Sequence, residues 1–200
     1  MNKAYIFTGT NASGKSTLIS YLYENNFIDG IYINPDLILQ EKLKLPETTE
    51  NYLKAFKIAS KTRNKMIQQK QNIVIETTFS SKNSIKLIKN LLENSYEIIF
   101  IYLTTDSPKI NAIYLMNRVI QGGHDVPLKL LLQRKKASFE NAQKIKNIVH
   151  QFITINNSNI DNNPTILSNC NFRIDNFKEY IKKSHQEKNK ILLKRSFFEL

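Results

Sequence analysis

The sequence predicts an α/β fold in which a mostly parallel sheet of about five strands lies between layers of helices. Short apolar runs alternate along the chain with longer amphipathic stretches, and this alternation is typical of strand–helix–strand units. A glycine-rich loop also stands between the first apolar run and the first amphipathic stretch. In parallel sheets, loops that follow the strands form the edge where ligands bind.

The predicted strands are short and rich in isoleucine, tyrosine or phenylalanine, the composition of strands that are buried on both faces. They span residues 3–8, 30–33, 72–75, 97–103 and 151–155, and residues 165–168 are expected to add an edge strand. Helical periodicity fills the intervals, over residues 15–25, 35–42, 50–70, 82–94, 107–121 and 127–150. Residues 157–164 are polar and turn-rich, so the chain is expected to leave the sheet there.

Composition indicates one globular domain over residues 1–200, closed by a basic helix at about 175–195. The hydrophobic content of 41% and the charged content of 23% are those of a soluble protein. Cys170 is the single cysteine, which excludes a disulfide framework. The chain has no signal-like N-terminus and no apolar run long enough to cross a membrane, so we expect a cytoplasmic protein without a membrane partner.

The formal net charge of +12 raises the question of a nucleic-acid partner. The lysines are spread along helical segments, however, and are not gathered with aromatic residues into a recognition motif. The densest basic stretch, residues 178–195, reads either as a solvated helix face or as a surface for nucleic acid or an acidic partner. We favour the solvated face, and part of the charge suits a site for polyanionic substrates.

The glycine-rich loop reads G-T-N-A-S-G-K-S and is a phosphate-binding P-loop in its proper context, after a strand and before a helix. A glycine-rich turn that matches by chance is the alternative. The glycines bring backbone N–H groups up to phosphate oxygens, and the helix start adds its positive dipole end. Lys15 is expected on the β- and γ-phosphates, and the Ser16 hydroxyl on Mg²⁺. The nucleotide-binding residues predicted here are Gly9, Thr10, Asn11, Ala12, Ser13, Gly14, Lys15, Ser16 and Thr17.

Two carboxylates follow the next two strands, Asp36 after residues 30–33 and Glu76 after residues 72–75. The carboxyl ends of parallel strands meet at one edge, so both should point toward the triphosphate. Phosphoryl transfer needs a carboxylate that orients or deprotonates the acceptor, and Asp36 is the better candidate. By itself, Asn34-Pro35-Asp36 is also an ordinary helix start, and Glu76 could be a solvated strand-end residue.

The segment R-V-I-Q-G-G-H-D-V-P, from Arg118 to Pro127, and Arg134 beyond it predict a lid over about residues 107–150. Arginine pairs well with phosphate oxygens, and closure of a lid excludes water from the reaction. Two surface arginines beside a helix–loop–helix turn are the alternative. His124 could contact substrate or be a polar loop residue. The fold class predicted is therefore a three-layer P-loop NTPase or kinase fold with an arginine-bearing helical lid.

The residue patterns that other kinds of catalytic or metal site require are absent from the sequence. The sequence has no cysteine and histidine cluster at metal-ligand spacing, no serine–histidine–aspartate pattern and no protein-kinase signature set. The only metal expected is Mg²⁺ bound with the nucleotide.

The P-loop, I-N-P-D-L-I, V-I-E-T-T-F-S and the lid segment resemble, in order and spacing, the zeta toxin family of P-loop kinases over about residues 3–158. The resemblance implies a kinase that uses ATP or GTP with Mg²⁺ to phosphorylate the 3′-hydroxyl of UDP-N-acetylglucosamine, restrained by an antitoxin. It implies Asp36 as general base, Arg118 and Arg134 as arginines at the γ-phosphate, and Glu76 and Thr77 near the acceptor. Asn157 and Ser158 would lie at the nucleotide base.

The segment between Asp36 and the third strand carries no toxin-specific residues, so the acceptor is the least determined part of this assignment. Two alternatives stay open. A polynucleotide or nucleotide kinase would fit the charge of +12, and a non-catalytic nucleotide-dependent module would act by binding a partner protein. The presence of Asp36 and the lid arginines argues against the second, because a nucleotide sensor needs neither.

Overall fold

A computed structural model describes residues 1–120, 126–159, 163–168, 174, 176–177 and 179–180. Its centre is a six-stranded sheet in the order β2-β3-β1-β4-β5-β6. The strands are β1 (Lys3–Thr8), β2 (Ile31–Ile33), β3 (Ile73–Glu76), β4 (Glu97–Thr104), β5 (Gln151–Asn156) and β6 (Thr165–Ile166). The first five are parallel and β6 pairs antiparallel with β5. The predicted α/β class is confirmed, with six strands where the sequence predicts about five.

The described helices are α1 (Lys15–Glu24), α2 (Pro35–Leu37), a π-helical segment η1 (Ile38–Leu43), α3 (Thr49–Gln68), α4 (Lys82–Glu93), α5 (Pro108–Ile120) and α6 (Leu128–Ile145). Two of the predicted helices differ from those in the structure. The helix expected over residues 35–42 is a short α-helix that widens into η1, and α6 ends five residues before 150, because a turn at Ile145 leads into β5. Most of the expected C-terminal helix and residues 121–125 of the lid lie outside the described residues.

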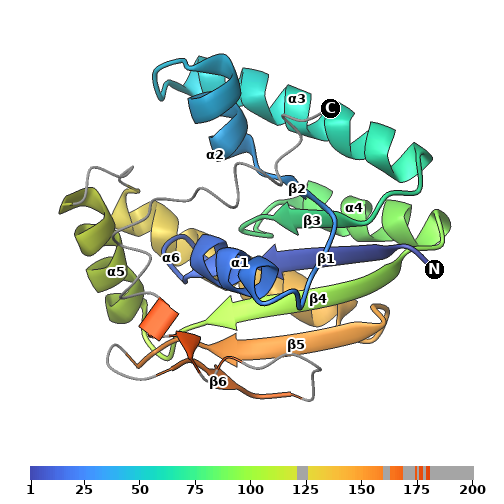
Figure 1. Cartoon of the computed structure of the whole chain (residues 1–200). Helices are drawn as coiled ribbons and strands as arrows, with labels where there is room; N and C mark the ends of the chain where they lie inside the picture. Colours follow the sequence, from blue (N-terminus) through green and yellow to red (C-terminus); the bar gives the residue numbers. More distant parts are fainter. Residues whose placement is uncertain (121–125, 160–162, 169–173, 175, 178, 181–200) are drawn as a thin grey trace.

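The core has one layer on each face of the sheet, since successive strand residues point to opposite faces. On β1, Tyr5 and Phe7 pack with α1, whereas Ala4 and Ile6 pack with residues of α3, α4 and α6. Figure 1 shows α1 in front of the sheet and α6 behind it. Burial on both sides explains why these strands are continuous apolar runs without polar alternation.

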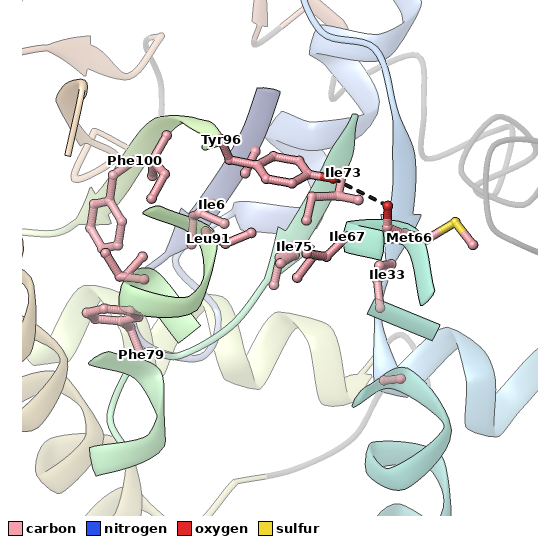
Figure 2. Packing of buried hydrophobic residues seen from close by; sticks show 14 of the residues in the cluster. Ile6, Ile33, Met66, Ile67, Ile73, Ile75, Phe79, Leu91, Tyr96 and Phe100 are labelled. Carbon is pink, nitrogen blue, oxygen red and sulfur yellow. Dashed lines mark hydrogen bonds between the residues drawn. The ribbon is translucent and has the colours of Figure 1, made fainter. Parts of the chain in front are cut away.

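The layer behind the sheet is held by aromatic side chains. Phe100 on β4 is fully buried and contacts Phe79 edge-on at a ring distance of 4.9 Å and Phe152 face-on at 5.2 Å. Tyr96 donates a hydrogen bond to the backbone oxygen of Met66 at the end of α3, which lies within the same cluster (Figure 2). This packing fixes β3 and β4 beside β1.

The parallel sheet brings the ends of distant segments to one edge. In Figure 1 the arrowheads of β1, β4 and β5 point to the same side, where α5 lies. The P-loop, Asn34 and Glu76 follow or end β1, β2 and β3, so all three meet at that edge. No helix in the described part of the chain is long and apolar enough to span a membrane.

Phe100→Ala should lower the free energy of unfolding by about 3–5 kcal/mol, because it opens a cavity between two aromatic rings. The matched control is Phe56→Ala on α3, where the side chain is 56% exposed and the expected loss is about 0.5 kcal/mol or less. Denaturant unfolding monitored by circular dichroism measures both. Equal losses in the two variants would contradict this account of the core.

Candidate active site

The P-loop is shaped by two glycines in left-handed conformations, Gly9 with φ 131° and Gly14 with φ 94°. A Cβ on Gly9 would lie 2.2 Å from the backbone oxygen of Leu103, and one on Gly14 would lie 2.7 Å from Nδ2 of Asn157. Both positions therefore exclude other residues by backbone strain and by contact. The loop is closely packed between β4 and the end of β5.

Lys15 opens α1 and curls back over the loop, where its Nζ donates to the backbone oxygen of Thr10 at 2.9 Å. The side chain is only 7% exposed. Burial lowers the pKa of Lys15, and the negative charges of Glu76 and Asp36 oppose that shift. The amino group is thus held at the P-loop, with the Glu76 carboxylate 4.0 Å away.

Glu76, the last residue of β3, gathers groups from three other segments. Its two carboxylate oxygens each lie 3.0 Å from the Ser16 hydroxyl, and Oε1 lies 4.0 Å from Lys15 Nζ. The Tyr32 hydroxyl and the Asn34 amide on the other side also donate to it. The family resemblance predicts Glu76 near the acceptor, and in the structure its carboxylate lies against Ser16 and Lys15.

These residues fit a magnesium ion that is bound with a nucleotide. A hydroxyl and a carboxylate 3.0 Å apart at Ser16 and Glu76 are the hard oxygen donors that Mg²⁺ prefers. Among the described residues no cluster of three or more histidine, cysteine, aspartate or glutamate side chains could hold a metal. Sites of this kind take their remaining ligands from phosphates and water.

Asp36 lies at the start of α2, beyond Asn34 and Pro35. The residue is exposed, yet the pKa of Asp36 is raised, first by desolvation from the surrounding protein and then by the charge of Glu76. Arg118 and Lys15 lower it and so oppose the shift. Burial, followed by the charges of Asp36 and Glu47, raises the pKa of Tyr52 on α3 to about 12. The carboxyl of Asp36 therefore lies within electrostatic reach of Lys15, Glu76 and Arg118.

The two arginines predicted on the lid lie on α5 and α6, and Arg134 contacts the P-loop. Arg134 Nη1 donates to Oδ1 of Asn11 at 2.9 Å, and the Thr10 hydroxyl donates to the backbone oxygen of Leu131 at 3.4 Å. The start of α6 is thus hydrogen-bonded to the P-loop. Arg118, in the last turn of α5, acts on Lys15 and Asp36 through its charge. His124 lies outside the described residues.

The remaining predicted residues have structural contacts. Asn157 donates from Nδ2 to the backbone oxygen of Ser13 at 3.0 Å, and its buried Oδ1 has no hydrogen-bond partner in the described part of the chain. The Ser158 hydroxyl accepts from the backbone N–H of Asp106 at 2.7 Å. The Thr77 hydroxyl accepts from the backbone N–H of Phe79 at 3.0 Å. Asn157 therefore contacts the P-loop directly, whereas Thr77 and Ser158 are hydrogen-bonded to neighbouring backbone.

Several residues of this network were not predicted from the sequence. They are Tyr32, the side chain of Asn34, the side chain of Asn11 as a partner of Arg134, and Tyr52. Tyr32 reads as an ordinary apolar strand residue, and Asn34 as a simple helix cap. Their placement just before Asp36 at a strand end was the available signal.

The chain is similar to a known protein family. The family model described as zeta toxin matches residues 2–166. The chain belongs to the zeta toxin family. A relative in Haemophilus influenzae, an uncharacterized protein, is 32% identical over 124 residues, which cover 62% of this chain and 85% of that protein.

Solved structures share the fold of this zeta toxin family member. One from the PezAT toxin–antitoxin system of Streptococcus pneumoniae has a TM-score of 0.61 at 15% identity, covering 93% of this chain and 85% of that chain. A putative kinase from Chloroflexus aurantiacus gives 0.61 at 16%, covering 92% and 96%. A chain of the Pnkp1/Rnl/Hen1 RNA repair complex gives 0.58 at 19% and covers 72% of this chain, which spans 46% of that longer one.

Gly14→Ala should weaken binding of Mg-ATP about tenfold or more, because strain of about 1–3 kcal/mol must be relieved by movement of the P-loop. The matched control is Gly30→Ala before β2, where φ is 123° and a Cβ would lie 2.7 Å from the backbone of Asn72. Both variants should lose stability, and only Gly14→Ala should lose affinity. Calorimetric titration and thermal melting separate the two effects, and equal affinity in both variants would contradict the role of Gly14.

Proposed function

We propose that this protein is a P-loop kinase that transfers the γ-phosphoryl group of ATP or GTP to a hydroxyl group of a small-molecule acceptor. The observation that carries the proposal is the position of the Asp36 carboxyl, within electrostatic reach of Lys15, Glu76 and Arg118 at the P-loop edge. Membership of the zeta toxin family supports a nucleotide-dependent kinase. A P-loop used only as a switch would not need a second carboxyl at this place.

The residues divide the work of phosphoryl transfer, which is mainly positioning and charge stabilisation. Lys15 would exchange its bond to the Thr10 oxygen for phosphate oxygens. Ser16 and Glu76 would hold Mg²⁺, which neutralises charge that develops on the phosphates. Arg134 at Asn11 and Arg118 would stabilise the transferred group, as their permanently charged planar heads suit phosphate oxygens.

Asp36 would act as the general base. A raised pKa suits this role, since a base works best when its pKa lies close to the operating pH. The carboxylate would accept the proton of the acceptor hydroxyl as its oxygen attacks the γ-phosphorus, and the bond from phosphorus to the β-phosphate oxygen would break. Thr77 and His124 are the other residues that we assign to the acceptor side.

The preferred acceptor is UDP-N-acetylglucosamine, on the resemblance of the motifs to the zeta toxin family. An antitoxin is the protein partner that we propose, in line with the family and with the toxin–antitoxin system named for the Streptococcus pneumoniae neighbour. The test is incubation with Mg-ATP or Mg-GTP and a panel of metabolites, with mass spectrometry for the gain of one phosphate. If an RNA oligonucleotide gains a phosphate and none of the metabolites does, the result would favour a polynucleotide kinase.

Asp36→Asn should lower kcat by about a hundredfold to ten-thousandfold, because the amide cannot accept the proton of the acceptor. Affinity for nucleotide should stay within about threefold, as the Lys15 and P-loop contacts remain. Asp29→Asn is the matched control, since Asp29 binds Asn72 and Tyr5 away from the P-loop. Near-normal transfer by Asp36→Asn would remove Asp36 as the base.

Turnover should fall on acidification at a pH above the value of about 3.9 that an ordinary aspartate shows. Desolvation and Glu76 raise the pKa of Asp36, so the carboxyl takes up its proton, and stops acting as a base, at a higher pH than usual. The measurement is kcat against pH at saturating Mg-ATP, with circular dichroism to confirm folding. Full activity down to about pH 4 would show that no group with a raised pKa limits transfer.

A further inference from the structure

We propose that Asn34 is a positioning residue for phosphoryl transfer, which holds the start of α2, and with it Asp36, at a fixed place relative to the Glu76 carboxylate. The proposal rests on the proposed kinase function of the same site. Asn34 is 9% exposed and follows β2 directly. Its side chain is hydrogen-bonded to both carboxylate-bearing segments, at the backbone N–H of Asp36 and at Oε2 of Glu76.

The two ends of the Asn34 amide face opposite kinds of group. Oδ1 accepts from the backbone N–H of Asp36 at 2.8 Å, while Nδ2 donates to Glu76 Oε2 at 3.2 Å and to the Tyr32 hydroxyl at 2.8 Å. The reverse orientation would set an NH₂ against an N–H and an oxygen against a carboxylate. Chemistry thus allows one orientation, in which a single planar group joins Asp36 to Glu76.

The start of α2 depends on this cap more than most helices do. The α-helix has three residues before it widens into η1, so few internal hydrogen bonds hold it. Pro35 keeps Asn34 in the extended conformation, with φ −131° and ψ 118°. Without the bond from its N–H to Asn34, Asp36 would be free to move relative to Glu76, and small displacements of a catalytic group cost large factors in rate.

The Tyr32 hydroxyl completes the link. It donates to Glu76 Oε2 and accepts from Asn34 Nδ2. Glu76 is thus held by two donors, Tyr32 in β2 and Asn34 just after it, in the segment that leads into the candidate base.

Two substitutions distinguish the role of the Asn34 amide oxygen from that of the amide nitrogen. Asn34→Asp keeps an oxygen for the Asp36 N–H but replaces the donor to Glu76 with a second carboxylate oxygen, whereas Asn34→Ala removes both bonds. Thr48→Ala is the matched control, because Thr48 also caps a helix, the neighbouring α3, by accepting from the backbone N–H of Asn51 at 3.3 Å, and is not part of the link between Asp36 and Glu76. Transfer from Mg-ATP to UDP-N-acetylglucosamine, or to the acceptor that the metabolite panel yields, is measured against pH. The titration of the Asp36 carboxyl is followed by NMR in protein with ¹³C-labelled aspartate.

Both Asn34 variants should bind ADP as the wild type does and lose kcat by about tenfold to a hundredfold. In Asn34→Asp the acidic limb of the pH profile and the Asp36 titration should move up together by about one pH unit, because a like charge is added. Thr48→Ala should change neither. If both Asn34 variants match Thr48→Ala in the two readouts, Asn34 is only a structural cap. If the wild type phosphorylates no acceptor, the proposed function fails, and the Asp36 titration still decides the role of Asn34.

Discussion

The site depends on the Glu76 carboxylate, a charged group 14% exposed at the end of a central strand. A charge in such a place is tolerated only when donors surround it. The donors come from the Ser16 hydroxyl, the Tyr32 hydroxyl and the Asn34 amide, with the Lys15 ammonium nearby. These donors come from two segments, the start of α1 and the strand β2 with the residue after it, so satisfying one carboxylate also sets the P-loop against β2.

The same constraint explains how the lid can act. The P-loop is held from three directions, by Glu76 at Ser16, by Asn157 at Ser13 and by Arg134 at Asn11. Its left-handed glycines leave no room for a Cβ, so the loop has little freedom to rearrange. A phosphate group would therefore meet preorganised donors, and electrostatic stabilisation of this kind costs no reorganisation during the reaction.

Much of the fold could be predicted from the pattern of apolar residues along the sequence. Strands buried on both faces must be continuous apolar runs, and the bounds of β1 were predicted to the residue. The least accurate helix prediction was that over residues 35–42, because hydrophobic period does not distinguish an α-helix from one that widens into η1. The length of α6 was overestimated for a similar reason, since residues after Ile145 keep the amphipathic pattern but form turns.

By itself the sequence determined the P-loop, because it is a local motif in which glycines shape the backbone and a lysine and a serine stand at fixed spacing. It also predicted Asp36 and Glu76 at one edge, since the carboxyl ends of parallel strands lie along the same edge of a sheet whatever the strand order. Only the tertiary structure decided which of these groups touch. Glu76 meets Ser16 across 60 positions of sequence, and Arg134 meets Asn11 across 123. Such contacts depend on strand register and helix packing, which no local pattern encodes.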